Sequence, residues 1–223
     1  MSKRVIHLKK DFVVAGGGLS GVCAAIAAAR HGMQVVLCHD RPVLGGNSSS
    51  EIRVWACGAT GMGNNRYADE TGIINELCLE NLYRNNEGNP VFWDALLLDF
   101  VLAEPGITLL LSTRVSEAFA ADGLIRSVRC EQSSTEKTFI LEAPLFADCT
   151  GDGALAVLAG AGYIYGFSGQ KSTEVKDTGS LGCTILFYTG KGENPVSYTP
   201  PSFAYTREQI AEFLEQTAKS LSI

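Results

Sequence analysis

The sequence lacks the features that mark several large classes of protein. Its 223 residues contain no run of Lys or Arg longer than Lys9-Lys10, and the formal net charge is −6. This balance argues against the basic surface that a dedicated DNA- or RNA-binding protein needs. There is also no internal repeat and no low-complexity tract. We therefore expect a globular protein that has no nucleic-acid partner.

Metal-binding patterns are missing as well. The seven cysteines form no C-x-x-C pair, and none of them lies at metal-ligand spacing from the three histidines, so no metal site is expected. Widely separated cysteines are typical of small buried residues in a reducing compartment, which predicts a cytoplasmic protein. Cys57 allows a redox-thiol interpretation, but no partner cysteine lies near it in the sequence.

The amino-terminal region has no continuous apolar helix. Four basic residues precede an uncharged stretch at 12–29 that ends in small residues, as a secretory signal would. However, Asp11 opens this stretch and three glycines at 16–18 interrupt it. It is also too short and too rich in glycine to span a membrane, so no membrane partner is expected.

Glycine, in contrast, is abundant and clustered. Short apolar runs at 11–15 and 34–38 flank a small-residue helix predicted over 19–31, which gives the order strand, glycine turn, helix and strand. The same architecture returns near residue 150, where a strand at 145–149 leads through Thr150-Gly151-Asp152-Gly153 into a helix at 154–161. Both units predict parallel strands with closely packed helices.

The remaining elements complete an α/β fold class, with a Rossmann-like parallel sheet, helices and an inserted small antiparallel β-meander. The character of the sequence changes at about residue 178, so we place one domain at 1–177 and the start of a second at 178–223. Between the two glycine units the sequence predicts helices at 68–83 and 91–103, a strand at 107–111, a hairpin of 113–120 and 124–130, and a strand at 137–141. Beyond residue 178 it predicts a strand at 181–188 and a helix that starts with a capping box at Thr206.

The strongest local signal is the G-x-G-x-x-G sequence of residues 16–21, which follows a strand and opens a helix. Gly16 would make the tight turn, Gly18 would let a pyrophosphate approach the backbone, and Gly21 would let helix and strand pack closely. The helix amino terminus would direct free N–H groups toward the phosphates. A purely structural glycine turn is the alternative, although the strand-helix-strand context favours a dinucleotide site.

This type of site usually has an acidic residue at the end of the second strand, where it binds a ribose. The sequence has His39 there, followed by Asp40. An imidazole can accept one ribose hydroxyl, and Asp40 serves if the strand ends one residue later. His39 could also be a loop residue without a role.

A second glycine turn follows in the loop that starts at Asp40 and ends at Arg53. Gly45-Gly46 precedes Asn47 and three serines, whose polar groups could bind a long polyhydroxylated cofactor. Arg53 could add positive charge near a phosphate or a flavin. Alternatively, the serine and asparagine side chains satisfy the backbone of the loop itself.

These motifs resemble the FAD-dependent oxidoreductase family, whose FAD-binding domain is of the glutathione-reductase type. The family has a D-R-P-x-L-G-G-N-x-S-S-E-I-R-like stretch, which residues 40–53 resemble, and an A-T-G-D-G-type motif, which residues 146–153 resemble. The resemblance implies FAD as cofactor and places the backbone near Val115 at the adenine. The residues expected to contact FAD are Gly16, Gly18, Leu19, Ser20, Gly21, His39, Asp40, Arg41, Gly45, Gly46, Asn47, Ser48, Ser49, Arg53, Val115, Thr150, Gly151 and Asp152.

The resemblance also implies an enzyme that transfers a hydride between FAD and a small-molecule substrate. Non-covalent FAD is expected, because the 47–53 loop has no histidine of the kind that holds flavin covalently in fumarate-reductase-like relatives. Members of the family continue well past 200 residues and complete a substrate domain. The resemblance therefore implies that 1–177 is the FAD-binding domain and that 178–223 is the incomplete start of the substrate domain. We expect a partial chain with uncovered apolar surface at 181–188. A nicotinamide-dependent dehydrogenase and a non-catalytic dinucleotide-binding fragment are the alternatives. No catalytic acid or base, substrate or oligomeric state can be assigned.

Overall fold

The computed structural model describes residues 4–57, 70–163, 192 and 199–220. The chain divides into two compact units, 1–182 and 183–223, which we describe separately. The predicted boundary between residues 177 and 178 lies outside the described residues, and so does the predicted strand at 181–188.

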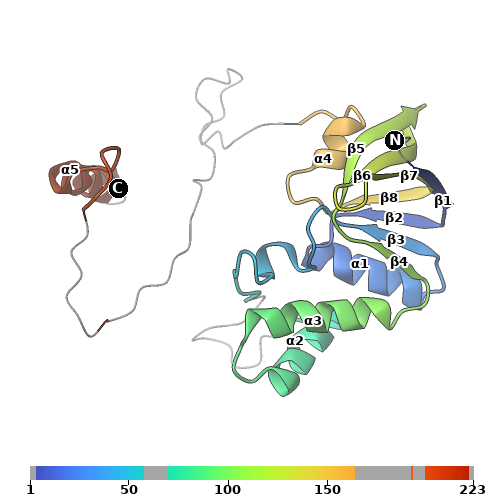
Figure 1. Cartoon of the computed structure of the whole chain (residues 1–223), viewed down its shortest axis with the longest axis horizontal. Helices are drawn as coiled ribbons and strands as arrows, with labels where there is room; N and C mark the ends of the chain where they lie inside the picture. The colour runs from blue at the N-terminus through green and yellow to red at the C-terminus, as the bar shows by residue number, and fades with distance from the viewer. Residues whose placement is uncertain (1–3, 58–69, 164–191, 193–198, 221–223) are drawn as a thin grey trace. The chain divides into compact units, whose positions relative to one another are not determined.

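The centre of the first unit is a parallel sheet of four short strands (Figure 1). Their spatial order is β4 (Ile107–Leu110), β3 (Val35–Cys38), β2 (Phe12–Ala15) and β8 (Leu145–Asp148). Apolar residues dominate these strands because both faces of the sheet are covered. Each strand was predicted from its apolar run. The first strand of this sheet, β2, lies between β3 and β8. The strand that follows β2 in the sequence is therefore on one side of it, and the last strand of the sheet is on the other.

A second sheet covers one face of the first and contains the predicted meander. Its spatial order is β1 (Val5–Lys9), β7 (Lys137–Glu142), β6 (Leu124–Gln132) and β5 (Thr113–Ala121). Asp122 and Gly123 form the expected two-residue hairpin turn, and both have positive φ angles, of 54° and 74°. Strand β1, which pairs in parallel with β7, was not predicted from the sequence. Its pairing partner lies more than 120 residues away, so local sequence gives little sign of it.

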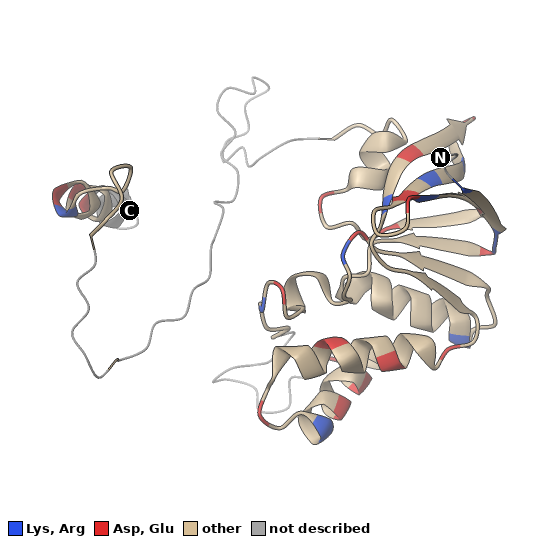
Figure 2. Ribbon diagram, viewed as in Figure 1, with Lys and Arg blue, Asp and Glu red and all other residues tan. Residues whose placement is uncertain are grey.

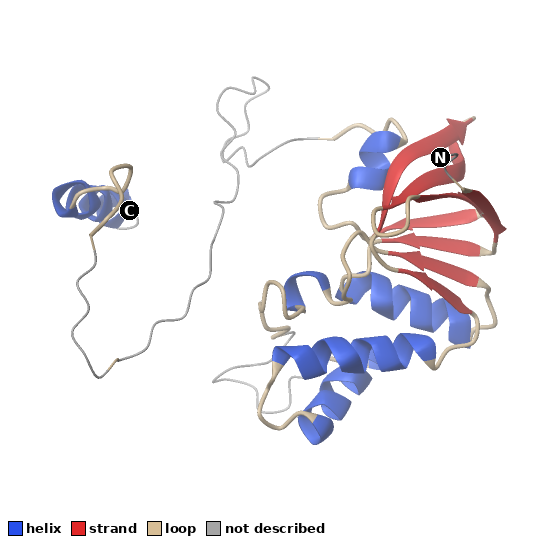
Figure 3. Ribbon diagram, in the orientation of Figure 1, coloured by secondary structure: helices blue, strands red, loops and turns tan. Residues whose placement is uncertain are grey.

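Helices cover the other face of the parallel sheet (Figure 3). They are α1 (Leu19–Arg30), α2 (Gly72–Arg84) and α3 (Pro90–Leu102), while the short helix α4 (Ala154–Leu158) follows β8. Helix α4 was predicted over 154–161 and is shorter than that. In the second unit, α5 (Arg207–Ser220) begins at the predicted capping box, where the backbone N–H of Thr206 donates to the Gln209 side chain.

Alternating side chains of the parallel sheet build two apolar cores. Val14, Val35 and Leu37 face the helices, whereas Val13 and Val36 face the second sheet. Charged residues are absent from β2, β3 and β4, whereas the second sheet, the helices and the loops carry them (Figure 2). The buried residues of α1 are Gly21, Val22, Ala25 and Ile26, so its core face combines the predicted small residues with branched apolar side chains.

Candidate functional site

The carboxyl ends of the parallel strands open into one cavity of about 810 Å³. Ligand sites of open α/β sheets lie at such ends, at the point where the connections diverge, here between β2 and its two neighbours. All three predicted glycine turns contribute to the wall. Of the residues expected to contact FAD, every one lines the cavity except Gly21, Ser49 and Arg53.

The glycines of the first turn meet different demands. A Cβ added at Gly16, whose φ is 105°, would lie 2.1 Å from the Cys149 carbonyl oxygen, and one at Gly21 would lie 1.8 Å from the Gly16 oxygen. These two glycines are therefore required by the packing of the chain itself. Gly18 differs, because its Cβ would meet no atom within 4 Å. Gly18 lines the cavity at the start of α1, so a side chain there would project into open space.

The second turn packs directly on the first. Gly45 donates its N–H to the Gly17 carbonyl at 2.8 Å and forms a bridge with Gly18. A Cβ at Gly46 would lie 3.1 Å from the Gly18 Cα. The two turns therefore form one continuous backbone surface along the cavity.

The serines of the second turn serve its own backbone, which was the alternative interpretation. The Ser48 hydroxyl donates to the Gly45 carbonyl, and the Ser49 hydroxyl donates to the Gly46 carbonyl. Ser49 is completely buried and does not reach the cavity. Helix α3 holds the same loop, because the Trp93 indole N–H donates to Ser48 and the Asp94 carboxylate accepts the Ser50 N–H at 2.9 Å.

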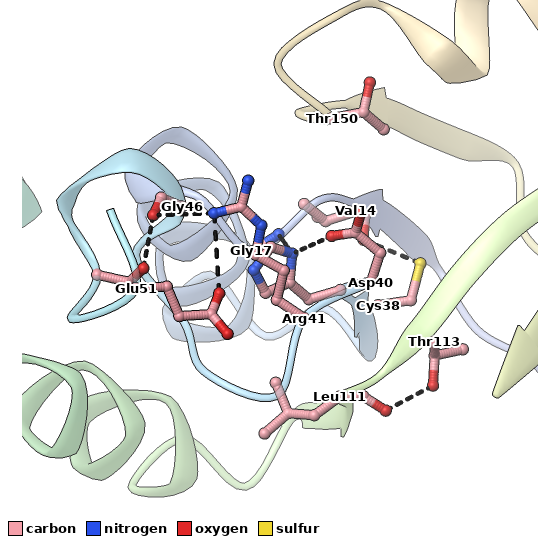
Figure 4. Close-up of polar contacts among 12 residues, drawn as sticks. Val14, Gly17, Cys38, Asp40, Arg41, Gly46, Glu51, Leu111, Thr113 and Thr150 are labelled. Carbon is pink, nitrogen blue, oxygen red and sulfur yellow. Dashed lines mark hydrogen bonds and ion pairs between the residues drawn. The ribbon is translucent and has the colours of Figure 1, made fainter. Parts of the chain in front are cut away.

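The two arginines of this loop have different positions. Arg41 lines the cavity, donates to the Gly46 carbonyl and lies 3.8 Å from the Glu51 carboxylate (Figure 4). Arg53 has a φ of 63° and donates from its Nε to the Ser50 carbonyl at 2.9 Å. Its side chain does not line the cavity, so Arg41 rather than Arg53 brings positive charge to this wall.

His39 is buried beneath the first glycine turn. Its Nδ1 accepts the Gly17 N–H at 3.0 Å, so this nitrogen carries no proton. Asp40 Oδ1 lies 3.4 Å from the same nitrogen, which is a contact between two acceptors rather than a salt bridge. The one acceptor of the neutral imidazole is thus already used. Asp40 lines the cavity and is 56% exposed at its side chain, so its carboxylate remains open to a ligand.

The third turn is organised by Asp148 at the end of β8. Its carboxylate accepts the Thr150 hydroxyl at 2.6 Å, the Thr150 N–H at 3.1 Å and the Ala156 N–H at 2.8 Å. Although burial alone would raise the pKa of Asp148, these hydrogen bonds hold it below its usual value. The Thr150 hydroxyl accepts the Ala154 N–H in turn, which fixes the turn to the start of α4.

A family comparison identifies the type of protein. A sequence model described as FAD dependent oxidoreductase matches residues 11–219. The chain belongs to the FAD-dependent oxidoreductase family. The cofactor of this family is FAD, in agreement with the cofactor and the enzyme class expected from the sequence. The open approach to Gly18 and the glycine turns that line the cavity fit such a dinucleotide.

Solved structures are similar to this chain at low sequence identity. The Mycobacterium smegmatis Sdh1 complex in the apo form is 16% identical, with a TM-score of 0.50 over 69% of this chain and 39% of that one. Thermovibrio ammonificans THI4 is 19% identical, with a TM-score of 0.46 over 68% and 61%. The glycerol-3-phosphate dehydrogenase from Bacillus halodurans complexed with FAD is 18% identical, with a TM-score of 0.43 over 63% and 34%. This chain therefore spans less than two thirds of each of these proteins. No curated protein matches it.

Several residues that line the cavity were not predicted from the sequence. They include Val54, Trp55 and Ala56 after the second turn, Arg114 and Ser116 on β5, and Val157 and Leu158 on α4. Val115 lines the cavity as expected, but its neighbours were missed because strand β5 reaches this place only through tertiary structure. The Trp55 ring lies against Gly88, whose added Cβ would be 2.8 Å from it.

The cysteines within the described ranges differ in their burial. No cysteine within the described ranges forms a disulfide bond, and Cys57 is exposed, contrary to the expected burial. Burial raises the pKa of Cys149, the thiol beside the third turn. Among residues 4–57, 70–163 and 199–220, no group of His, Cys, Asp and Glu side chains could hold a metal ion. None of the helices in those ranges is long and apolar enough to cross a membrane.

Proposed function

We propose that this chain binds FAD without a covalent bond in the cavity at the ends of the parallel strands. In our proposal the chain is the FAD-binding part of an oxidoreductase, and this enzyme transfers a hydride to or from a small-molecule substrate. The observation that carries the proposal is Gly18. The fold does not need a glycine there, yet the absence of a side chain keeps the cavity open at the amino terminus of α1. A diphosphate needs this space and the N–H groups around it.

The residues along the cavity suggest how the parts of FAD are distributed. Gly16, Gly18, Leu19 and Ser20 would bind the diphosphate through their backbone, with Arg41 as the nearby positive charge. Asp40 would accept ribose hydroxyls in place of His39, and the backbone near Val115 would contact the adenine. Gly45, Gly46, Asn47 and Ser48 would line the path of the chain that leads to the flavin, with Thr150, Gly151 and Asp152 on the opposite side.

Three residues of the predicted set receive a supporting role in this proposal. Gly21 allows α1 to pack on the turn, Ser49 closes the second turn, and Arg53 contacts the Ser50 carbonyl. Bound FAD would supply the two-electron redox chemistry, while the protein would orient the cofactor and exclude water. No side chain in the described residues is assigned as a catalytic acid or base.

The absorbance spectrum of the purified chain tests the proposal. The chain is expressed with excess FAD, free cofactor is removed, and spectra are recorded before and after acid precipitation. We expect flavin bands in the native protein and complete release of the flavin into the supernatant. A colourless protein after this treatment contradicts FAD binding, and flavin retained in the pellet contradicts non-covalent attachment.

A substitution at Gly18 tests the site itself. Gly18→Ala should weaken FAD binding about tenfold or more, which corresponds to roughly 1.4 kcal/mol, because the methyl group would occupy the space proposed for the diphosphate. Its free energy of unfolding should change by less than about 1 kcal/mol, since no atom of the chain lies in the way. Gly162→Ala is the matched control, because its Cβ is also unobstructed but Gly162 does not line the cavity. Equal FAD affinity in both variants would show that the diphosphate does not pass Gly18.

A further inference from the structure

His39 occupies the position where this type of site usually places an acidic ribose ligand, but its contacts point to a different task. The imidazole is 5% exposed and packs directly under Gly17, where an added Cβ would lie 2.8 Å from the His39 Cγ. Its Nδ1 accepts the Gly17 N–H at 3.0 Å. The Gly17 carbonyl is held as well, by the N–H of Gly45 at 2.8 Å. Both polar backbone groups of Gly17 are therefore held by hydrogen bonds.

Fixing Gly17 determines where the next residue lies. Gly18 follows directly, is the cap residue before α1 and presents its open side to the cavity. If the Gly17 N–H lost its acceptor, the turn that aims Gly18 and the first N–H groups of α1 would lose one of its two anchors. A buried N–H without an acceptor also costs about 1–3 kcal/mol.

The protonation state of His39 decides whether that anchor exists. A neutral imidazole offers one acceptor nitrogen, and here it is Nδ1. An imidazolium would place an N–H on Nδ1 that faces the Gly17 N–H, so the hydrogen bond could not form. The new donor would instead be attracted to Asp40 Oδ1, only 3.4 Å away. Protonation would thus release the first glycine turn and also engage the carboxylate proposed to bind the ribose.

The surroundings favour the neutral form. Burial is the main influence that lowers the pKa of His39, and Arg41 acts in the same direction, whereas Asp40, Glu51 and the Val43 carbonyl oppose it. His39 Nε2 is buried without a hydrogen-bond partner in the described parts of the chain, because the Val43 carbonyl falls short of hydrogen-bond geometry. The other contacts come from the backbone of Leu110 and Thr113, which pair with the main chain of His39.

We propose that His39 is a positioning residue whose neutral imidazole holds the first glycine turn in its FAD-binding shape, so that protonation of His39 alone weakens FAD binding. This inference rests on the FAD site proposed above. It assigns the histidine a structural contact beneath the cofactor site and a pH dependence that an acidic residue at this position would not give.

The experiment compares the wild type with His39→Asn and His39→Leu by titrating the ligand-free protein with FAD and following flavin fluorescence between about pH 8 and pH 5. The Asn Oδ1 can take the place of Nδ1 as an acceptor that does not titrate. Wild-type affinity should be constant at high pH and then fall, at most about tenfold per pH unit for one proton. His39→Asn should bind FAD at high pH within about threefold of the wild type and lose this fall. His39→Leu should bind weakly at every pH, because it has no acceptor.

Ligand-free protein gives a second readout. The pKa of His39 is lowered in the folded state, so the unfolded state takes up the proton first as the pH falls below about 6.5. As the pH falls through that window, the unfolding free energy of the wild type should therefore decrease more steeply than that of His39→Asn. The difference between the two slopes should approach the slope that one bound proton gives. Asp40, Arg41 and Glu51 are present in both proteins, so their titration cancels in the comparison.

The outcomes separate this inference from the proposed function. FAD binding by the wild type with the same pH dependence in His39→Asn would overturn the role of His39 and leave the FAD site intact. Full affinity in His39→Leu at high pH would do the same. Absence of FAD binding by the wild type at every pH would overturn the FAD site and the inference together.

Discussion

The glycines around the cavity are demanded by different neighbours, and the difference separates structural from binding residues. Gly16 and Gly21 cannot carry a side chain, because backbone atoms of the chain lie where the Cβ would be. Gly17 is buried against the His39 ring and the Leu44 side chain. Only Gly18 among these four faces open space. A residue kept small without a packing reason is the residue at which a ligand is expected to approach.

At the third turn one carboxylate does most of the positioning, which predicts a clear effect of Asp148→Asn. An amide oxygen can replace only part of the three hydrogen bonds from Thr150 and Ala156, and the amide NH₂ would face a donor. We expect a loss of about 1–2 kcal/mol in unfolding free energy, measured by chemical denaturation at pH 7. FAD affinity should fall with it, because Thr150 lines the cavity.

The pH dependence of this loss gives a check on its cause. The pKa of Asp148 is lowered in the folded protein, so its contribution is present above about pH 4 and disappears as the pH falls through the folded-state value. Wild type and Asp148→Asn should therefore converge in stability at acid pH. Asp152→Asn is the comparison variant, since Asp152 lies exposed at the cavity and should affect FAD affinity alone. A constant stability difference at all pH values contradicts the ionised carboxylate as the cause.

At the scale of elements, α1 depends on its close approach to the turn after β2. Gly21→Ala would bring a methyl carbon to 1.8 Å from the Gly16 oxygen, and a backbone atom cannot yield as a flexible side chain can. We expect the free energy of unfolding to fall by about 3 kcal/mol or more, which is the upper part of the range for overpacked cores. Thermal or chemical unfolding measures this loss. Ala25 and Ile26 would lose their fit to the sheet at the same time. Gly18→Ala, one helical turn earlier, should leave the stability nearly unchanged, and equal losses in the two variants would contradict this packing argument.

Elements whose pattern is local were predicted well from the sequence. The strands at Val13, Val36 and Leu109 were predicted because each lies in a short continuous apolar run, and the hairpin was predicted because Asp122 and Gly123 adopt positive φ angles with little strain. The strand β1 was missed because its partner β7 is distant in sequence. The predicted helix before residue 72 begins in a range that the structure does not describe.

The candidate site was predictable where glycine turns carry it and hidden where folding supplies its walls. The three turns meet at one cavity because parallel strands end at the same edge of a sheet. The contact of His39 with Gly17 could not be predicted, since the choice between a ribose and a backbone N–H depends on the direction of the ring. Arg114 and Trp55 reach the cavity from a strand and a loop with no motif of their own.

At the scale of the whole molecule, the residues that line the cavity all belong to the first unit. Its two cores are built from residues between Ile6 and Leu155, and they lie on opposite faces of one parallel sheet. The cavity is lined by residues between Gly16 and Leu158. Sheet, cores and cavity thus share the same stretch of chain, so the stability of the sheet and the affinity for FAD should depend on each other.

This arrangement predicts that a chain of residues 1–163 folds by itself and retains the site. It should unfold cooperatively and bind FAD with a dissociation constant within about threefold of that of the 223-residue chain, a difference below roughly 1 kcal/mol. Saturating FAD should stabilise it, by about 2.7 kcal/mol at a free concentration of 100 times the dissociation constant. Circular dichroism during denaturation and fluorescence titration measure the two quantities. The same short chain with Gly18→Ala is the control, because it should fold equally well and bind FAD more weakly. A fragment that unfolds without cooperativity would show that the cores need residues beyond 163, and a folded fragment that does not bind FAD would show that the cavity needs them.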